Sequence, residues 1–438
     1  MLVSARTAAR FFAFGSLSLT LACGGSEAGV DALNAGGAGA GATNSGGTAS
    51  TAGSSQVAGA AGANAGSSSG AGGSTTGGSG ATGGAGGSEG GTITGGSAGT
   101  AGSGGSAAGS AGAGGSSSNE PRLLPQDGNP VYGLFNKYKS AWPKDKADII
   151  LSHQYQNGGW PKNQEYDAAG NGGNDPGTFD NSATTTEMSF LADVYKTSGG
   201  TKYRDAVRQA MTFILSAQYS TGGWPQYYPL RGGYYDHVTF NDDAMVRVLL
   251  VLYHAGAKLP PFDGDLFDDA ARAKMKTAIA KGVDYIVKAQ YTQQGKLAVW
   301  CAQSGKDDYQ PKLARAYELP SLSGSESVGI IGFLMTQPQT AAVEKAVKAA
   351  LTWYRAPTTY LADHKYDTSN TTNPIVPSAG SKLWYRFYEL ADNKPMFVNR
   401  EGTVFRDLAL LDAERRNGYR WGGDYGAKLI AYGTSVGY

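Results

Sequence analysis

A long stretch without large apolar residues limits what this chain can fold into. From about Gly24 to Ser118 the sequence is nearly all Gly, Ala, Ser and Thr. Such a composition cannot bury enough apolar surface to offset the entropy of ordering the chain. We therefore predict a disordered tether over residues 24–121 and one folded domain over residues 122–438, which holds all seven tryptophans. A domain of that size can bury a large core.

The residues before the tether are typical of an export signal. Arg6 and Arg10 precede an apolar run that extends from Phe11 to Ala22 and ends at Cys23. Because the run is short, we expect a signal over residues 1–23 and not a membrane span. Its last four residues, TLAC, resemble a lipoprotein signal. Two outcomes stay open: plain secretion, or a lipid on Cys23 that tethers the domain at the outer surface.

Cysteine usage and charge narrow the function only slightly. With Cys23 removed or lipidated, Cys301 has no disulfide partner and is expected to be a buried, small apolar residue. The chain has 37 basic and 36 acidic residues, a formal net charge of +1. Any binding of an anionic partner must therefore come from local clusters of charge. We expect a monomer with no nucleic-acid partner, and membrane association only through the lipid.

One motif is repeated in the folded region. Residues 154–161, QYQNGGWP, return 64 residues later as QYSTGGWP, and a fainter third copy begins at Gln290 with its tryptophan displaced. Apolar residues recur at helical spacing before each copy, over residues 147–152, 203–217 and 270–289. Further helices are expected over residues 184–195, 244–255, 341–354 and 404–416.

Strand signals are weak by comparison. Repeated helices joined by Gly-rich turns predict an all-α fold, an α/α toroid or barrel built from helical hairpins, with long loops forming the active-site cleft. The Gln-x-x-x-Gly-x-Trp motif has two interpretations. The glutamine can bond to backbone while the tryptophan packs over it, or Trp160 and Trp224 can line a sugar subsite. Both can hold at once.

Two turns beyond these tryptophans are rich in oxygen-bearing side chains. They read TFDNSA at residues 178–183 and TFNDDA at residues 239–244. Both precede helices, so the structural alternative is that they only cap helix N-termini. If the repeat places them at equivalent helix ends, Asp180, Asn181 and Asp242 converge. Calcium prefers such carboxylate and amide oxygens.

Arginines in aromatic surroundings mark the C-terminal half. They are Arg315, Arg386, Arg400, Arg415 and Arg416. Guanidinium groups bind carboxylates through two parallel hydrogen bonds and stack on rings, as recognition of an anionic sugar polymer requires. The alternative is ordinary ion pairing with neighbouring glutamates, namely Glu318, Glu389, Glu401 and Glu414.

Taken in order, these motifs resemble the pectate lyases of polysaccharide lyase family ten, over about residues 131–421. The matching stretches are GGWPKN at 158–163, TFDN at 178–181, GGWPQ at 222–226, HVTFND at 237–242, RAYELPS at 315–321 and WYRFYE at 384–389. The resemblance implies a calcium-dependent enzyme with an α/α toroid. It also implies cleavage of (1→4)-α-D-galacturonan, or polygalacturonate, by anti β-elimination to 4,5-unsaturated oligogalacturonates.

The resemblance also implies roles for single residues. Asp180, Asn181 and Asp242 belong to the calcium site, and Arg400 matches the Brønsted base. The expected substrate-binding residues are Arg315, Arg386, Arg415, Lys162, Trp160, Tyr317 and His237. Lys162 and His237 are reserve candidates for proton transfer.

Two other classes of function remain open. A glycoside hydrolase of the α/α-barrel type would use Asp180 and Asp242 as catalytic acid and base on an anionic polysaccharide. A non-catalytic pectin-binding protein would keep the Arg and Trp contacts without turnover.

Overall fold

The computed structural model describes residues 128–438. The predicted export signal, Cys23 and the predicted tether lie outside the described residues. Within the described part, no helix combines the length and the hydropathy needed to cross a bilayer.

Helices in contacting pairs form most of the described chain. The α-helices are α1 (Pro130–Phe135), α2 (Ala147–Ser152), α3 (Thr185–Ser198), α4 (Thr201–Ala217), α5 (Ala244–Gly256), α6 (Asp269–Ala289), α7 (Glu326–Met335), α8 (Ala341–Arg355), α9 (Ala413–Gly418) and α10 (Tyr425–Ser435). Helix α3 pairs with α4, α5 with α6, and α7 with α8. Short 3-10 helices join them: η1 (Asn136–Ser140), η2 (Lys144–Lys146), η3 (Asp180–Ser182), η4 (Gly233–Asp236), η5 (Asn241–Asp243) and η6 (Leu408–Leu410).

Strands run between and beyond these helices, so the predicted all-α fold class, the α/α toroid, is wrong. The strands are β1 (Gly177–Thr178), β2 (Tyr227–Tyr228), β3 (Val238–Thr239), β4 (Thr292–Gln293), β5 (Lys296–Leu297), β6 (Gln303–Ser304), β7 (Leu322–Ser323), β8 (Tyr360–Tyr366), β9 (Ile375–Tyr385), β10 (Phe387–Tyr388), β11 (Phe397–Val398), β12 (Val404–Phe405) and β13 (Gly422–Gly423). They form one antiparallel sheet in the order β13-β9-β8 and five two-stranded pairs: β1-β2, β3-β6, β4-β5, β7-β10 and β11-β12. The fold is mixed helix and strand.

The strands left little trace in the sequence for a physical reason. Most are two residues long, too short to show alternation of apolar and polar residues. The long strand β8 is interrupted by Asp363, whose φ is 55°, where the pairing with β9 shifts register. Strand β9 contains Pro377 and Gly380, which are both poor strand formers.

The helix predictions over residues 147–152, 203–217 and 270–289 are confirmed as α2, α4 and α6. Those over residues 184–195, 244–255 and 341–354 are confirmed as α3, α5 and α8. The helix predicted over residues 404–416 is wrong, because that stretch is divided among β12, η6 and α9.

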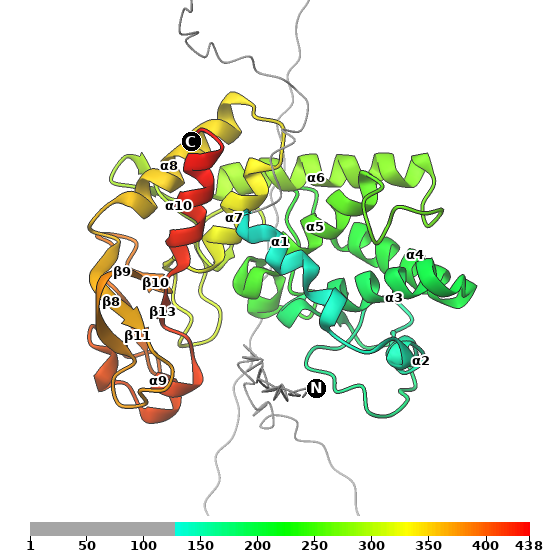
Figure 1. Cartoon of the computed structure of the whole chain (residues 1–438), viewed down its shortest axis with the longest axis horizontal. Coiled ribbons are helices and arrows are strands. Elements are labelled where there is room, and N and C mark those ends of the chain that lie inside the picture. The colour runs from blue at the N-terminus through cyan, green and yellow to red at the C-terminus, as the bar shows by residue number, and fades with distance from the viewer. Residues whose placement is uncertain (1–127) are drawn as a thin grey trace, which may run out of the picture. The chain divides into compact units, whose positions relative to one another are not determined.

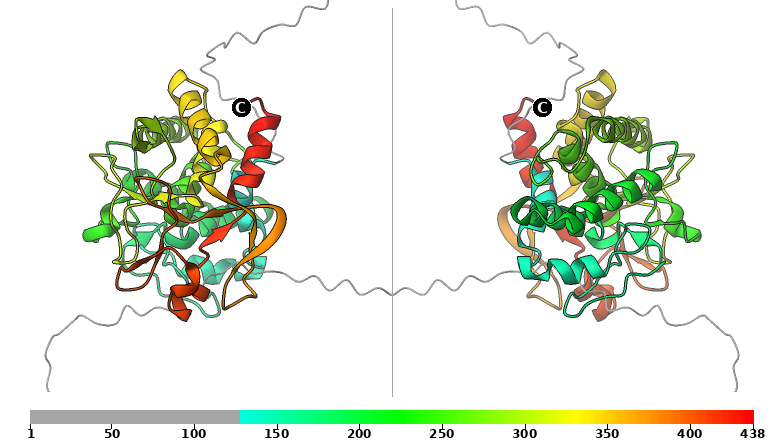
Figure 2. Two further views of the ribbon diagram at one scale, coloured as in Figure 1. Left: turned by 90° about the vertical axis from the view of Figure 1, so that its left-hand side faces the viewer. Right: turned by 90° about the vertical axis from the view of Figure 1, so that its right-hand side faces the viewer.

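Two helices with almost no exposed side chains lie in the main core. Helix α5 buries residues along nearly its whole length, among them Val246 and Leu250, and α7 does the same with Ile330 and Phe333. A smaller core around Trp421 supports the C-terminal strands. Figure 1 shows helices α3–α6 on one side and strands β8, β9 and β11 with α9 on the other. The views of Figure 2 look along this direction, with the strands nearer the viewer on the left and helices α3–α6 nearer on the right. Helix α7 contacts both α5 and η5, the turn that leads into α5.

The repeated glutamine connects each turn to a later helix. Its side-chain amide donates twice to backbone carbonyls, once within its own turn and once to the C-terminal partner of the next helix pair. The acceptors are Gly158 (3.0 Å) and Ala206 (2.9 Å) for Gln154, Gly222 and Ala278 (both 2.9 Å) for Gln218, and Ala298 (2.8 Å) and Ala346 (3.0 Å) for Gln290. We call these contacts the glutamine staples.

A buried tryptophan completes each staple. The indole N–H groups of Trp160, Trp224 and Trp300 each donate over 2.8 Å to a backbone carbonyl of the preceding helix, at Ile150, Ile214 and Ile286. All three side chains are fully buried. Trp300 is the displaced tryptophan of the third copy. The structural interpretation of the motif is therefore confirmed, and so is the expected burial of Cys301.

Glu187 in α3 makes stability depend on pH. Its carboxyl is fully enclosed, Tyr166 donates to Oε1 over 3.0 Å, and Oε2 is buried without a partner. Burial raises the pKa of Glu187 from its ordinary value of 4.5 to about 7. Between these values the folded state holds a proton that the unfolded state has released, so stability falls as pH rises through this window.

We predict that Glu187→Gln removes this loss of stability. Relative to wild type, the variant should gain about 3 kcal/mol in free energy of unfolding between about pH 4 and pH 8, since one pKa unit corresponds to about 1.4 kcal/mol. Urea unfolding across that range measures the difference, with Glu165→Gln at an exposed position as control. A difference that does not change with pH contradicts the assignment.

Candidate active site

The two oxygen-rich turns come together, as the repeat predicts. They contain η3 and η5, which are in contact and lead into α3 and α5. Asn181 and Asp242 occupy equivalent left-handed positions, with φ of 50° and 52°. The staples hold both turns, because the backbone N–H of Thr178 donates to Trp160 and that of Thr239 to Trp224, each over 3.2 Å.

Asp180 is a buried carboxylate that needs a cation. It is 6% exposed, and its Oδ2 accepts a hydrogen bond from Lys162 Nζ over 2.9 Å. Burial raises the pKa of Asp180, Lys162 opposes that shift, and the nearby charge of Asp242 adds to it. The two predicted metal-site carboxylates are thus close enough to repel each other. Asn181 is exposed, and its amide donates to Asn163 over 2.8 Å.

Asp242 is held from the other side by Arg386. The guanidinium Nη2 lies 3.0 Å from Asp242 Oδ1 and 2.5 Å from Glu326 Oε1. Burial disfavours the charge on Arg386, but Glu326 and Asp242 outweigh that cost and raise its pKa. Asn241, which the sequence analysis did not assign, donates over 2.7 Å to Asp242 Oδ2.

Glu326 is a site residue that the sequence analysis missed. It stands at the start of α7, directly after β7, as Asp180 follows β1 and Asp242 follows β3. It is 2% exposed, and the hydroxyl of Ser323 donates to it. The sequence signal was present as a third turn, but the displaced Trp300 concealed its equivalence to the other two.

The predicted arginines gather around one ring. The guanidinium carbons of Arg315, Arg400 and Arg415 lie 4.8, 4.8 and 4.6 Å from the ring centroid of Tyr317. Guanidinium groups stacked in this way are held without losing their hydrogen-bonding edges. The structure therefore brings five of the predicted substrate-binding residues and the predicted base into two adjoining groups, one acidic and one basic.

The three arginines have different surroundings. Arg315 binds Glu318 with two hydrogen bonds of 2.9 and 2.6 Å, and its charge also lowers the pKa of Asp180. Arg400 is exposed and binds Glu414 with two bonds of 3.2 and 2.6 Å. Arg415 is 2% exposed and donates to the carbonyl of Val398 over 3.2 Å. The ion-pairing alternative therefore holds for Arg315 and Arg400, and their role in substrate binding stays a prediction.

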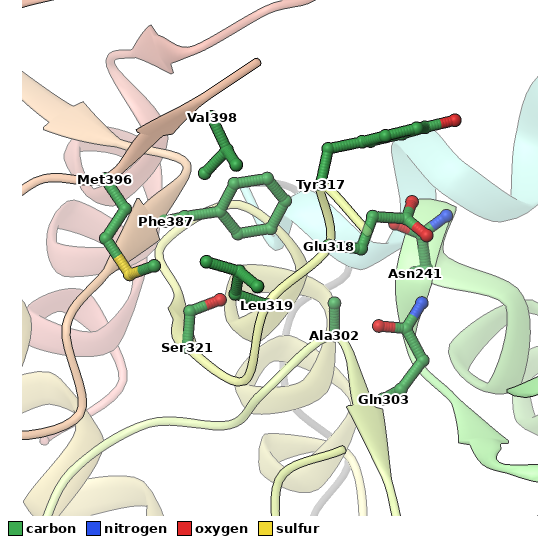
Figure 3. Close-up of a pocket in the computed structure, with 10 residues that line it drawn as sticks. All are labelled: Asn241, Ala302, Gln303, Tyr317, Glu318, Leu319, Ser321, Phe387, Met396 and Val398. Atoms are coloured by element: carbon green, nitrogen blue, oxygen red, sulfur yellow. The ribbon is translucent and has the colours of Figure 1, made fainter. Parts of the chain in front are cut away.

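Tyr419 joins the acidic and basic groups. Arg386 lies 4.4 Å and Arg415 4.7 Å from its ring centroid. Tyr317 also lines a pocket in which the carboxylate of Glu318 and the amides of Asn241 and Gln303 gather on one side, with apolar side chains opposite (Figure 3). Tyr317 extends over the polar side of that pocket.

Two predicted substrate-binding residues lie elsewhere. Trp160 is fully buried in its staple and presents no ring face to solvent. His237 precedes β3, where burial lowers its pKa, Lys312 adds to that shift, and a hydrogen bond with the backbone of Leu313 opposes it. None of the groups acting on His237 belongs to the acidic or basic group.

The donor atoms of the two oxygen-rich turns determine which metal ion could bind there. Among residues 128–438, no three His, Cys, Asp or Glu side chains form a group able to hold a metal ion. A set of donors made only of oxygen atoms is nevertheless present in the carboxylates of Asp180 and Asp242 and the amides of Asn181 and Asn241. Their mutual repulsion is the situation that a cation relieves, so the donor chemistry fits a hard ion such as calcium.

Comparisons with known proteins show what the chain as a whole is similar to. The profile of the pectic acid lyase family matches residues 137–430. The solved structure of a family 10 polysaccharide lyase from Cellvibrio cellulosa is 55% identical, covers 73% of this chain and 100% of its own, and gives a TM-score of 0.71. An aspartate-to-alanine mutant of a family 10 polysaccharide lyase from the same organism, in complex with trigalacturonic acid, is 55% identical over 72% of this chain and 100% of its own, with a TM-score of 0.71. No curated protein matches.

Identity and coverage of this extent show the class of protein: it is an enzyme, a polysaccharide lyase. The profile match then places it: the chain belongs to the pectic acid lyase family, the pectate lyases. The resemblance stated from the sequence is confirmed.

Burial of Trp160 leads to a prediction. Trp160→Phe removes the hydrogen bond to Ile150 and leaves a cavity, so it should lower the free energy of unfolding by about 2–4 kcal/mol. The KM for polygalacturonate should stay within about twofold, because the ring does not reach the site. Trp224→Phe, which loses the equivalent hydrogen bond to Ile214, is the matched control. A raised KM with unchanged stability in Trp160→Phe alone assigns the ring to a sugar subsite instead.

Proposed function

We propose that this pectate lyase cleaves (1→4)-α-D-galacturonan by calcium-assisted anti β-elimination and releases 4,5-unsaturated oligogalacturonates. The main support is the meeting of two carboxylate-bearing turns with a group of arginines. A relative bound to trigalacturonic acid supports a galacturonate substrate. Arginines in this number suit a polymer that carries one carboxylate on each sugar.

Elimination requires that negative charge on the uronate carboxylate be neutralised. The proton on C5 leaves to a base, its bonding electrons form the C4=C5 double bond, and the C4–O glycosidic bond breaks with protonation of the leaving oxygen. The uronate carboxylate must accept negative charge as the C5 proton departs. Calcium, when bound, would neutralise that charge. Asp180, Asn181, Asp242 and Asn241 are the residues that would hold it.

The protein's own cations have separate tasks. Lys162 pairs with the buried Asp180 over 2.9 Å, and Arg386 pairs with the half-exposed Asp242 over 3.0 Å, so each balances the negative charge of one aspartate. The guanidinium edge of Arg315 or Arg400 would bind the substrate carboxylate in place of Glu318 or Glu414. Tyr317 fixes both guanidinium planes and so limits the entropy lost when substrate binds.

Two arginines compete for the role of base. The resemblance assigns it to Arg400, whose partners are Glu414 and Tyr317. Geometry favours Arg315, because its partner Glu318 lines the same pocket as Asn241, the neighbour of Asp242 in the proposed calcium site. In either case the base is the neutral guanidinium, a form that bound calcium and neighbouring arginines would favour once substrate takes the place of Glu318 or Glu414.

Elimination leaves a product that hydrolysis does not, a C4=C5 double bond. Wild-type enzyme on polygalacturonate should produce ultraviolet absorbance of unsaturated uronates, and EDTA should abolish it until calcium is restored. Growth of reducing ends without absorbance assigns the chain to the hydrolases. Binding of pectate without either signal supports a binding protein.

Matched variants decide between the two bases. If Arg315 is the base, Arg315→Lys should lower kcat by about 100-fold or more, the contribution usual for acid–base catalysis, while Arg400→Lys should mainly raise KM. The opposite pattern assigns the base to Arg400. Polygalacturonate binding, measured by calorimetry, separates a loss of chemistry from a loss of affinity. Equally small effects of the two substitutions on kcat exclude both arginines as the base.

A further inference from the structure

An arginine outside the assigned residues lies over two tyrosine rings. The guanidinium carbon of Arg231 is 4.6 Å from the ring centroid of Tyr227 and 5.0 Å from that of Tyr235. The two rings meet edge to face, with centroids 5.3 Å apart. We call Arg231, Tyr227 and Tyr235 the Arg231 platform.

The platform is attached directly to the turn that carries Asp180. Strand β2 pairs with β1, which places Tyr227 opposite Thr178. The carbonyl of Gln226, the residue before Tyr227, accepts from the Thr178 hydroxyl over 2.7 Å and from the Phe179 N–H over 3.0 Å. Any sugar held at Asp180 is therefore close to this strand.

The loop that carries Arg231 is also tied down. The backbone N–H of Gln226 donates to the carbonyl of Tyr235 over 2.9 Å, which joins the two ends of the loop. The carboxylate of Asp236 accepts from the N–H of Gly232 over 2.9 Å. Gly232 and Gly233 have φ of 84° and 63°, values that suit glycine and let the chain turn directly after Arg231.

The platform borders both groups of the active site. On one side, Tyr227 lies close enough to Lys162, the partner of Asp180, for each to shift the pKa of the other. On the other side, Tyr235 packs on Tyr234 with ring centroids 4.0 Å apart. Tyr234 is in turn close enough to Arg315 to feel its charge.

Arg231 differs from the other arginines of the site in its partners. Arg315, Arg386 and Arg400 each bind a carboxylate of the protein. Arg231 is exposed, and within residues 128–438 it has ring contacts but no carboxylate partner. Stacking fixes the guanidinium plane and leaves its N–H edge available for a carboxylate from outside.

We propose that the Arg231 platform is a further subsite of the enzyme, which binds the carboxylate of a galacturonate unit outside the pair that is cleaved. The tyrosine rings fix the guanidinium plane, and Arg231 supplies two parallel hydrogen bonds to the uronate. This assignment rests on the proposed function, because it takes the sugar at Asp180 as its reference point. It gives the enzyme a preference for longer chains.

The test compares substrates of different length. Arg231→Ala, Arg231→Lys and wild type are assayed on polygalacturonate and on an oligogalacturonate series from the trimer upward. We expect Arg231→Ala to raise KM on long substrates by about five- to tenfold, where tenfold corresponds to about 1.4 kcal/mol. The kcat at saturation and the kcat/KM on the shortest cleaved oligomer should stay unchanged. Arg231→Lys keeps the charge and should recover part of the loss.

Controls make each outcome decisive. Arg204→Ala, in α4 and paired with Asp205, should leave KM unchanged at every length. A loss in Arg231→Ala that is equal at all lengths, a loss in kcat, or no change in KM each overturns the proposal. Elimination by wild type is measured first. Its absence would refute the proposed function, whereas its presence with an unaffected Arg231→Ala refutes only the subsite.

Discussion

The glutamine staple is the interaction on which the rest of this structure depends. Each staple satisfies two buried carbonyl groups with one side-chain amide, and each such bond contributes about 1 kcal/mol net. Their importance is greater than that sum, because an unsatisfied buried carbonyl costs more than a formed bond gains. The turn that a staple holds leads through the buried tryptophan to a short strand and then to a site residue. Asp180 and Asp242 are thus positioned by hydrogen bonds made elsewhere, to helices α4 and α6.

The electrostatics of the site follow from burial. Three turns carry the acidic residues: Asp180 and Glu326 are buried, and Asp242 is half-exposed. Lys162, 18 residues from Asp180, and Arg386, 144 residues from Asp242 and 60 from Glu326, supply the opposite charge. A buried carboxylate without such a partner would bind a proton and lose its value as an oxygen donor. The ion pairs with Lys162 and Arg386 are therefore needed for these carboxylates to act as oxygen donors.

Local regularities were predictable from the sequence, and distant pairings were not. Helices α4 and α6 followed from apolar spacing within single segments. The pairing of Arg315 with Glu318 was visible because the two residues are three positions apart. Strand β1 is defined only by its partner β2, about fifty residues away, so no pattern within it could reveal a strand. Arg386 and Glu326 are likewise separated by 60 residues. Family resemblance named the site residues, but it could not show that Trp160 lies inside the core.

The placement of the tryptophans has a spectroscopic consequence. Five of the seven indoles, those of Trp160, Trp224, Trp300, Trp384 and Trp421, are at most 1% exposed. Indoles shielded from water emit at shorter wavelengths than hydrated ones. The intrinsic fluorescence of the protein therefore reports mainly on the integrity of the stapled core. Tyrosine and arginine side chains form the proposed sugar-binding groups. The Trp421 ring lies 5.0 Å from the guanidinium carbon of Arg415, so Trp421 is the buried indole whose emission substrate would affect most.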